Sequence, residues 1–485
     1  MPGSRVTGRT MHYGSSAPHD GVLRLTATQH TALVAHLFPG DGLEAVALLL
    51  CGRGGTSSGR EVLTVNSIHC IPHAECAVRT PNRVTWRTDQ LMPVLSKASK
   101  LDFGVVKIHS HPGGLAEFSL IDDEADRELF PGIHGWTDGS RPHLSAVMLP
   151  QGRIFAREVT GEGQFRPWTD VVRVGPVLEF WDNRPGSAFG PDGLTAQAVQ
   201  KRTAQAFGEG TVQLLRKLRI GVVGCSGTGS WVIEMLGRLG VGRLVLIDPD
   251  RIEMHNLNRI VNATEDHAAA GASKVTVLAE ATRRMGLGTQ VEPLPVDVMS
   301  TRAVAALSQC DVVFGCTDAI DAREVLNRVA VYYQVPLIDV GVRLEADGLG
   351  GVEQIVGSVH YVHPESRSFL ERRLYTPAQL YAVGLRRDDP EAYAQQVRQR
   401  YIRGADEERP AVASVNALYA SLAVNELLAR IHAVRDDADP LESITISLTQ
   451  LRMLTATDSG HPTAYARWIG RGDSSPRLGM VGLVD

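Results

Sequence analysis

The apolar and polar positions of the chain fall into two regions with different rhythms. In the first region, short apolar runs are interrupted by a few amphipathic stretches, a pattern typical of a compact mixed-sheet α/β unit. The expected strands cover 45–51, 62–69, 103–108, 144–149 and 153–158, and the expected helices cover 28–37 and 88–100 and begin again at Ser119.

In the second region, from Arg219 onward, apolar runs alternate regularly with amphipathic helical stretches. Alternation with short connections predicts a doubly wound, Rossmann-like parallel sheet. The expected strands cover 219–223, 243–247, 291–295, 311–314 and 336–340, with helices near 229–240, 272–285, 301–308 and 319–333. Residues 345–410 are expected to be irregular, 412–432 to form a helix, and the remainder to form a strand and a loose tail.

The change of rhythm predicts two folded domains, because 485 residues exceed what one hydrophobic core usually serves. The segments RPW and NRPGSAFGPDG lack periodic apolar positions and are typical of a linker. We therefore predict a disordered arm at 1–20, a mixed-sheet domain at 21–160, a linker at 161–195 and a doubly wound domain at 196–485.

Composition narrows the classes of partner. A formal net charge of −5 and a pI near 6.4 provide no global attraction to nucleic acid or to an anionic membrane. The first residues lack the apolar segment of a secretory signal, and no apolar run approaches the length that spans a bilayer. Six cysteines occur without a CxxC pair, which favours a reducing cytoplasm.

The segment His109-Ser-His111-Pro, at the end of an expected strand, carries the candidate metal chemistry. Side chains at i and i+2 of a strand point the same way, so two imidazoles share one face. Asp122, in the first turn of the next helix, can add an oxygen ligand and leave the fourth zinc position open for water. Ser119 can cap that helix and donate a hydrogen bond to a tetrahedral oxyanion. Glu44 is the candidate general base.

This segment resembles the signature of the JAMM (JAB/MPN+) metalloproteases, Glu…His-Ser/Thr-His-Pro-x6-Ser-x2-Asp. The resemblance implies a zinc-dependent isopeptidase that cleaves after the C-terminal glycine of a ubiquitin-like protein. The family's glutamate usually lies about seven residues before a glycine, whereas Glu44 lies eight before Gly52, so Glu61 and Glu75 are kept as alternatives. The competing interpretation, a polar strand end followed by an ordinary helix cap, does not account for the complete spacing.

A glycine-rich turn, Gly224-Cys-Ser226-Gly227-Thr-Gly229, joins the first strand of the second region to a helix. Backbone amides and the helix dipole at such a turn favour a polyphosphate. Asp248 and Asp250 end the next strand, where a carboxylate can accept hydrogen bonds from ribose hydroxyls. By themselves these features describe an NAD(P)-dependent oxidoreductase equally well.

Further polar residues favour adenylation over hydride transfer. Asn256, Asn258 and Arg259 lie in a loop past the ribose carboxylates, Lys274 begins a helix, and Asp318 follows another strand, with Arg323 and Asn327 behind it. Cations stabilise charge on an α-phosphate as pyrophosphate leaves, and an aspartate can hold Mg²⁺.

The region of roughly 200–430 resembles the ThiF/MoeB/ubiquitin-activating superfamily, including the late helix SVNALYASLAVNELL. By that resemblance Arg259 and Lys274 contact the phosphates of ATP, Asp248 contacts ribose, and Asp318 binds Mg²⁺. The implied reaction is attack of a C-terminal glycine carboxylate on ATP to give an acyl-adenylate.

The resemblance also implies a homodimer, in which Arg202 reaches into the partner's active site. Relatives that pass the acyl group onward use a cysteine, but none follows Cys316 here. The expected acceptor is therefore an external thiol or amine, or a separate conjugating enzyme.

Together the two regions predict a bifunctional enzyme that processes and activates a ubiquitin-like protein ending in glycine. Three alternatives stay open: activation of a sulfur-carrier protein in biosynthesis, an NAD(P)-dependent oxidoreductase, and a scaffold in which both sites are inactive.

Overall fold

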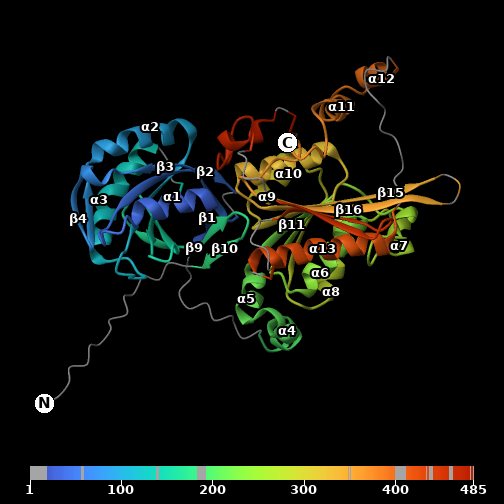
Figure 1. Ribbon diagram of the computed structural model, residues 1–485, viewed down its shortest axis with the longest axis horizontal. Helices are drawn as coiled ribbons and strands as arrows, with labels where there is room; N and C mark the ends of the chain where they lie inside the picture. Colours follow the sequence, from blue (N-terminus) through green and yellow to red (C-terminus); the bar gives the residue numbers. More distant parts are fainter. Residues whose placement is uncertain are drawn as a thin grey trace.

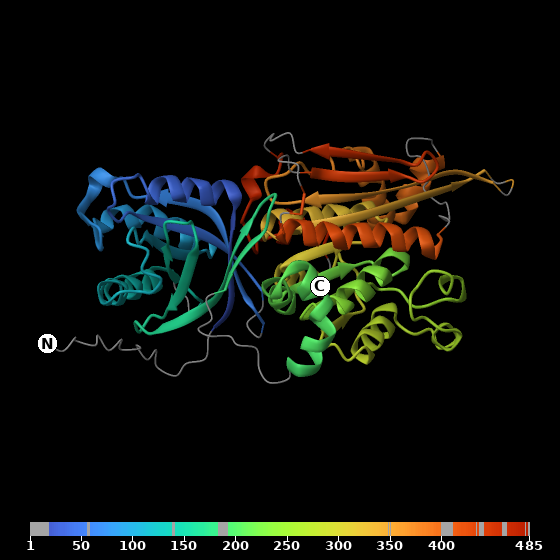
Figure 2. The same ribbon diagram turned by 60° about the horizontal axis from the view of Figure 1, so that its bottom comes forward.

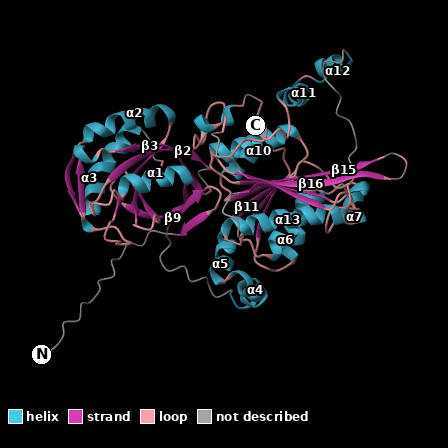
Figure 3. Cartoon of the chain, viewed as in Figure 1, coloured by secondary structure: helices cyan, strands magenta, loops and turns pink. Residues whose placement is uncertain are grey.

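The computed structural model contains two eight-stranded sheets that lie beside each other along the long axis of the molecule (Figure 1). The described residues are 19–55, 59–137, 141–182, 193–347, 349, 351–398, 411–432, 434–435, 441–457, 463–480 and 482–483. The disordered arm predicted at 1–20 falls mainly on residues 1–18, which lie outside this set. Both sheets are accompanied by helices, which confirms the predicted α/β class (Figure 3).

The first sheet is mixed, with the strand order β1-β3-β2-β6-β7-β8-β9-β10, and parallel pairing of β1 with β9 closes it into a ring. Its strands are β1 (His19–Thr26), β2 (Val46–Gly54), β3 (Glu61–Cys70), β6 (Gly104–Ser110), β7 (Leu144–Met148), β8 (Ile154–Val159), β9 (Phe165–Val174) and β10 (Glu179–Asp182). Around it lie α1 (Ala27–Leu37), η1 (His73–Glu75), the pair β4 (Cys76–Thr80) and β5 (Arg83–Trp86), η2 (Thr88–Gln90), α2 (Leu91–Leu101) and α3 (Leu120–Thr137).

Strands β9 and β10 correct the linker that the sequence analysis placed at 161–195. Residues 165–182 belong to the first sheet, and Trp168 of β9 is fully buried against β1. Pro167 interrupts the local pattern, and pairing with the distant β1 makes this segment a strand. The rest of the predicted linker includes 183–192, which lie outside the described residues.

The second sheet has the order β13-β12-β11-β14-β15-β16-β17-β18. Its parallel part contains β11 (Arg219–Val223), β12 (Arg243–Ile247), β13 (Gln290–Leu294), β14 (Val312–Gly315) and β15 (Leu337–Ala346). The helices and single turns are α4 (Gly193–Phe207), α5 (Glu209–Lys217), α6 (Gly227–Arg238), η3 (Met254–Asn256), α7 (Glu265–Ala269), α8 (Lys274–Arg284), α9 (Thr301–Ser308), α10 (Ile320–Tyr332), α13 (Ala413–Ile431), η4 (Ala466–Trp468) and η5 (Arg477–Gly479).

An antiparallel extension replaces much of the irregular segment predicted at 345–410. Strand β16 pairs with β15 and continues the sheet, and two helices follow it. These elements are β16 (Val352–Val362), α11 (Pro377–Asp388), α12 (Pro390–Arg398), β17 (Leu441–Ser447) and β18 (Arg452–Thr457). Strand β16 was not predicted because much of it is only partly buried, so its sequence lacks the apolar run expected of a buried strand.

The two sheets share a continuous interface. Val62 and Val172 of the first sheet belong to the same buried apolar cluster as Ile220 and Phe314 of the second. Arg60 is also buried there and pairs with Asp311 of the second domain at 2.6 Å. The two domains therefore form one packed body.

The C-terminal segment 469–473 is inserted between β2 of the first sheet and α10 of the second. The amide of Gly52 donates to the carbonyl of Gly470 at 3.2 Å, and Tyr333 Oη donates to Asp473 at 2.6 Å. Gly52 has no space for a side chain, since a Cβ there would lie 2.3 Å from the backbone of Arg471. This close backbone approach is what requires glycine at position 52.

Strand direction separates the two candidate sites. Val46 at the start of β2 pairs with His109, whereas the interface lies at the other end of β2, about 20 Å away at about 3.3 Å per residue. In the second sheet, Asp311 at the start of β14 faces the interface, so the carboxyl ends of the parallel strands point away from it. The free end of the β15–β16 hairpin projects in that outward direction (Figures 1 and 2).

No helix among the described residues combines the length and apolar character that crossing a membrane requires.

Candidate functional site

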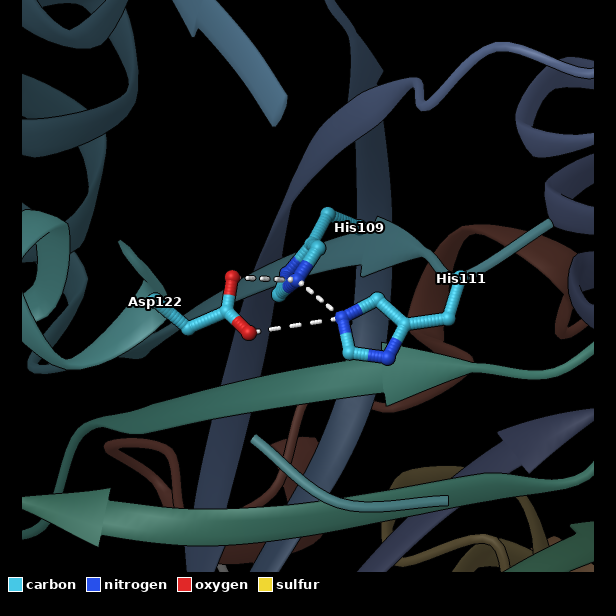
Figure 4. Close-up of side chains that lie close together, drawn as sticks. All are labelled: His109, His111 and Asp122. Carbon is cyan, nitrogen blue, oxygen red and sulfur yellow. Dashed lines mark hydrogen bonds and ion pairs between the residues drawn. The ribbon is translucent and has the colours of Figure 1, made fainter. Parts of the chain in front are cut away.

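Strand β6 and helix α3 bring together the three predicted metal ligands, His109, His111 and Asp122, which we call the metal cluster (Figure 4). The Nε2 atom of His109 lies 2.9 Å from Asp122 Oδ1, and that of His111 lies 3.3 Å from Asp122 Oδ2. All three residues are buried, and their ligand atoms lie within 4.8 Å of one another.

The donor set of the metal cluster fits zinc. The two Nε2 atoms lie 3.1 Å apart, close to the roughly 3.4 Å expected between two nitrogens at about 2.1 Å from a tetrahedral ion. His111 Nδ1 lies 2.8 Å from the carbonyl of Leu115. When Nδ1 donates its hydrogen to that carbonyl, the lone pair of Nε2 points toward the cluster and can bind a metal. Burial lowers the pKa of His109, which favours the neutral ring that a metal requires.

Asp122 is held as an anion. Burial alone would raise its pKa, but its contacts with the two imidazoles and the amide of Ser119 hold the pKa far below its ordinary value. Ser119 donates to Asp122 Oδ2 from its amide at 2.7 Å and from its hydroxyl at 2.8 Å. Asp122 in turn donates its amide to Ser119 Oγ at 3.2 Å, so the expected helix-capping contact is present. The oxyanion role of Ser119 stays a prediction.

Glu44 is buried two residues before β2, beside the end of β6. The adjacent Ala45 exchanges two hydrogen bonds with Ser110, through its amide at 2.9 Å and its carbonyl at 3.0 Å. Burial raises the pKa of Glu44 to about 7. The charge of His111 lowers this pKa, and the charge of Asp122 raises it. A carboxyl group with this pKa suits proton transfer near neutral pH.

The two alternatives to Glu44 lie elsewhere. Glu61 begins β3, at the interface end of the sheet where Val62 pairs with Gly54. Glu75 is exposed in η1 and accepts a hydrogen bond from Gln90. The geometry therefore favours Glu44 among the three candidates.

A cleft of about 1430 Å³ opens at the carboxyl ends of the parallel strands in the second sheet. Most of the residues predicted to bind nucleotide line it: Gly224, Ser226, Gly227, Asp248, Asp250, Asn256, Arg259, Lys274 and Asp318. The cleft continues along the β15–β16 hairpin, past Val342 and Gly357. It is therefore long enough to hold more than a nucleotide.

The glycine turn is built for close approach of backbone. Gly224 has a φ of +86°, a conformation that other residues rarely adopt, and a Cβ there would lie 2.6 Å from the carbonyl of Cys316. Helix α6 begins at Gly227, so its first amides lack intrahelical partners and face the turn. A Cβ on Gly229 would meet the carbonyl of Gly224 at 1.8 Å, so Gly229 supports the turn without lining the cleft.

Charged side chains surround the turn. Asp248 accepts the amides of Cys225 at 2.7 Å and Asp250 at 2.9 Å, which ties the ribose candidate to the glycine turn. Lys274 Nζ lies 2.7 Å from Asp250 Oδ2 and is mostly buried. Arg259 is held at the rim of the cleft by a 2.7 Å bond to the carbonyl of His255.

Two further predicted residues, besides Gly229, lie outside the cleft. Asn258 is exposed and donates to the carbonyl of Ala411 at 3.1 Å. Arg202 is exposed on α4 and is not among the residues that line the cleft. Its proposed reach into a partner's active site stays a prediction.

Asn416 is a cleft residue that the sequence analysis did not single out. It lies on α13, accepts from Thr228 Oγ1 at 3.3 Å and has a buried Nδ2 without a hydrogen-bond partner among the described residues. Its only signal in the sequence was its place in the late helix of the ThiF-like pattern. Arg323, noted only as lying behind Asp318, also lines the cleft and contacts the buried Asp339 at 3.2 Å.

Comparison with known proteins matches both regions. Residues 26–158 match the model for prokaryotic homologs of the JAB domain, and residues 199–462 match the model for the ThiF family. The adenylyltransferase and sulfurtransferase MOCS3 of Caenorhabditis briggsae is 34% identical over 142 residues, covering 29% of this chain and 35% of the relative. The SAMP-activating enzyme E1 of Haloferax volcanii is 33% identical over 130 residues, covering 27% of this chain and 47% of the relative.

Among solved structures, E. coli MccB is similar with a TM-score of 0.42 and 19% identity, over 56% of this chain and 72% of that chain. The chain spans less than half the length of the two curated relatives named above. The ThiF model, in contrast, matches more than half of this chain. The chain therefore belongs to the ThiF family and carries a JAB-type domain in front of its ThiF domain.

Proposed function

We propose that the chain is a bifunctional enzyme of a ubiquitin-like protein pathway. Its second domain adenylates a C-terminal glycine carboxylate with ATP, and its first domain cleaves the peptide or isopeptide bond that follows such a glycine. The observation that supports the proposal is that the predicted metal ligands gather in one cluster and most of the predicted nucleotide-binding residues line one cleft.

In the adenylation step, a carboxylate oxygen of the terminal glycine attacks the α-phosphorus of ATP, the new P–O bond forms, and pyrophosphate leaves. The amides that begin α6 hold the phosphates. Lys274 and Arg259 offset the charge that develops on the α-phosphate. Asp318, exposed at the cleft, would hold Mg²⁺, which neutralises the departing pyrophosphate when bound.

In the cleavage step, zinc held by the metal cluster would acidify a water molecule. Glu44 accepts a proton from the attacking water and returns it to the leaving nitrogen as the C–N bond after the glycine breaks. Ser119 donates its hydroxyl hydrogen to the developing oxyanion, for which it exchanges its present partner Asp122.

The proposed partner is a ubiquitin-like or sulfur-carrier protein whose last residue is glycine. The extension of the cleft along β15 and β16 supports an extended tail as substrate. The names of the relatives, a SAMP-activating enzyme and an adenylyltransferase and sulfurtransferase, favour both kinds of carrier. We further propose a cytoplasmic homodimer that passes the acyl group to an external thiol or amine, or to a separate conjugating enzyme.

ATP–pyrophosphate exchange tests the adenylation half. Purified chain is incubated with labelled pyrophosphate and a panel of small proteins ending in glycine that are encoded near its gene. Exchange that requires one of these proteins and no nicotinamide nucleotide supports the proposal and excludes the oxidoreductase. Absence of exchange with every member, together with tight binding of NAD(H), would overturn it.

Fusion of a reporter to the last glycine of the same carrier tests the cleavage half. We expect zinc-dependent release of the reporter with a free glycine terminus, identified by mass spectrometry. Release that survives chelation and His111→Ala would contradict the assignment of the metal cluster.

A further inference from the structure

A second buried pair lies directly below the metal cluster, between the same strand and the same helix. Lys107 precedes His109 by two residues on β6, and Asp126 follows Asp122 by four residues on α3. Lys107 Nζ donates to Asp126 Oδ1 at 2.6 Å, next to the 2.9 Å contact between His109 and Asp122. Residues two apart on a strand and four apart on a helix share one face. The two pairs therefore form together only when α3 lies on β6 in a single alignment.

Arg157 of β8 completes this network. Its Nη2 donates to Asp126 Oδ2 at 2.6 Å, and its Nη1 donates to Asp123. Its guanidinium carbon lies 3.9 Å from the centre of the Phe118 ring and 3.7 Å from that of Phe165. Arg157 therefore contacts both the segment that leads into α3 and the helix itself.

The network is too deeply buried to be a surface ion pair. The Asp126 side chain is fully buried, and those of Lys107 and Arg157 are 8% and 2% exposed. Burial alone would raise the pKa of Asp126, but the charges of Lys107 and Arg157 hold it below its ordinary value. Buried ion networks stabilise little compared with apolar packing, and fixing a register is their best-attested role.

The register of α3 on β6 matters because the metal cluster tolerates only a small displacement of its ligand atoms. A slip of α3 by one turn would displace Asp122 by about 5.4 Å. That displacement exceeds the 4.8 Å that spans all the ligand atoms. Two cations face two carboxylates in the network, so it adds no formal net charge beside the ligands and acts through geometry.

We propose that Lys107, Asp126 and Arg157 are positioning residues that set the register of α3 on β6, and thereby the affinity of the metal cluster for zinc. The proposal deepens the proposed cleavage function and rests on its zinc site. Its readout is metal binding, which can be measured without a protein substrate.

Zinc and cobalt binding to the full chain tests the proposal. The variant Lys107→Met/Asp126→Leu/Arg157→Met replaces the three most deeply buried members of the network by apolar side chains. Asp123, whose side chain is 17% exposed, keeps its contact with Arg127 at 3.7 Å. We expect its Zn²⁺ affinity, measured by competition with a chromophoric chelator, to fall about 10–100-fold. Bound Co²⁺ should lose the strong visible absorption of a tetrahedral site. Asp126→Asn should shift both readouts in the same direction.

Glu426→Gln is the matched control, because it alters a buried carboxylate paired with Arg430 on α13 of the second domain. Its metal binding should equal that of the wild type. A folded triple variant with wild-type zinc affinity and cobalt spectrum, or an equal loss in the control, would overturn the proposal. If the triple variant does not fold, Asp126→Asn decides by the same readouts. Absence of zinc binding by the wild type would contradict the proposed cleavage function as well.

Discussion

The guanidinium of Arg24, on the first strand of the first sheet, donates a 3.0 Å hydrogen bond to the backbone carbonyl of Tyr333, at the end of α10 in the second domain. It also reaches the carbonyls of Ser308 at 2.8 Å and Cys310 at 2.7 Å, at the end of α9. One buried cation thus satisfies carbonyls at the ends of two helices, where the helix dipoles favour positive charge. Burial lowers the pKa of Arg24 to about 9, which leaves it charged at neutral pH.

Arg24→Met is therefore expected to weaken the interface between the domains. The change leaves three buried carbonyls without their donor, which we expect to cost about 3 kcal/mol of unfolding free energy. Urea unfolding followed by circular dichroism should show a lower midpoint, or separate transitions for the two domains. Arg153→Met, at an exposed arginine of the first domain, should change the unfolding free energy by no more than about 0.5 kcal/mol. Equal effects of the two variants would show that Arg24 does not couple the domains.

The stability of the first domain should fall in acid because of His143. This histidine is fully buried and accepts the amide of Val105 through Nδ1, so it is neutral in the folded state. Burial, aided by the charge of Arg53, holds its pKa well below 6.5, and the unfolded chain therefore binds a proton first as the pH falls. The stability that this neutral ring contributes is present above pH 6.5 and is lost below it.

The difference in unfolding free energy between wild type and His143→Gln isolates this effect from other histidines. As the pH falls from 7.5 to 5.5, the wild type should lose about 1.4 kcal/mol of unfolding free energy relative to His143→Gln. Urea titrations at the two pH values measure it. A difference that is the same at both would mean that His143 titrates normally.

The sequence could predict the metal cluster because its determinants are local. His109, His111 and Asp122 lie within one strand, loop and helix, and the period of each element fixes where its side chains point. The glycine turn at Gly224 is local in the same way. In short segments of this kind, the local sequence alone determines where the side chains point.

Features that depend on distant partners could not be read in the same way. Asn416 reaches Thr228 from 188 residues away, and no local pattern marks that contact. Strand β9 is defined by its pairing with β1 at the other end of the domain. Strand β1, which carries Arg24, was not among the expected strands, and only the docking of the second domain gives Arg24 its buried role. Register between distant segments is set by the packed fold, not by local periodicity.

Lys274→Ala should lower ATP–pyrophosphate exchange about 100–1000-fold, because a buried cation beside the phosphates is lost. The contact of Lys274 with Asp250, at 2.7 Å, already directs its ammonium group into the cleft. Lys201→Ala removes an exposed lysine of α4 and should leave exchange unchanged. If Lys274→Ala retained the wild-type rate, the phosphate contact would have to come from another residue.

His109→Ala, or chelation of the metal, should lower cleavage at least about 100-fold and leave pyrophosphate exchange intact. The reason is the opposite orientation of the two sites relative to the interface, which separates the metal cluster from the cleft. Asp318→Ala should have the reverse effect. Both assays are run on each variant, and loss of both activities in either one would show that the two domains depend on each other.

Glu44→Gln should separate metal binding from proton transfer. The amide has nearly the same shape as the carboxyl group but cannot accept the proton of the attacking water, so cleavage should fall about 100–10,000-fold. Zinc content should stay at the wild-type level, because Glu44 is not one of the three clustered ligands. Reporter release and metal analysis on the same preparation measure the two quantities.

Glu61→Gln and Glu75→Gln are the matched controls for this prediction, since each makes the same chemical change at a glutamate away from the metal cluster. Glu61 lies at the interface end of β3, and Glu75 is exposed in η1, so neither change should affect cleavage. A large loss in one of them, with normal cleavage in Glu44→Gln, would transfer the role of general base to that residue. Loss of zinc from Glu44→Gln would instead make Glu44 a determinant of the metal site.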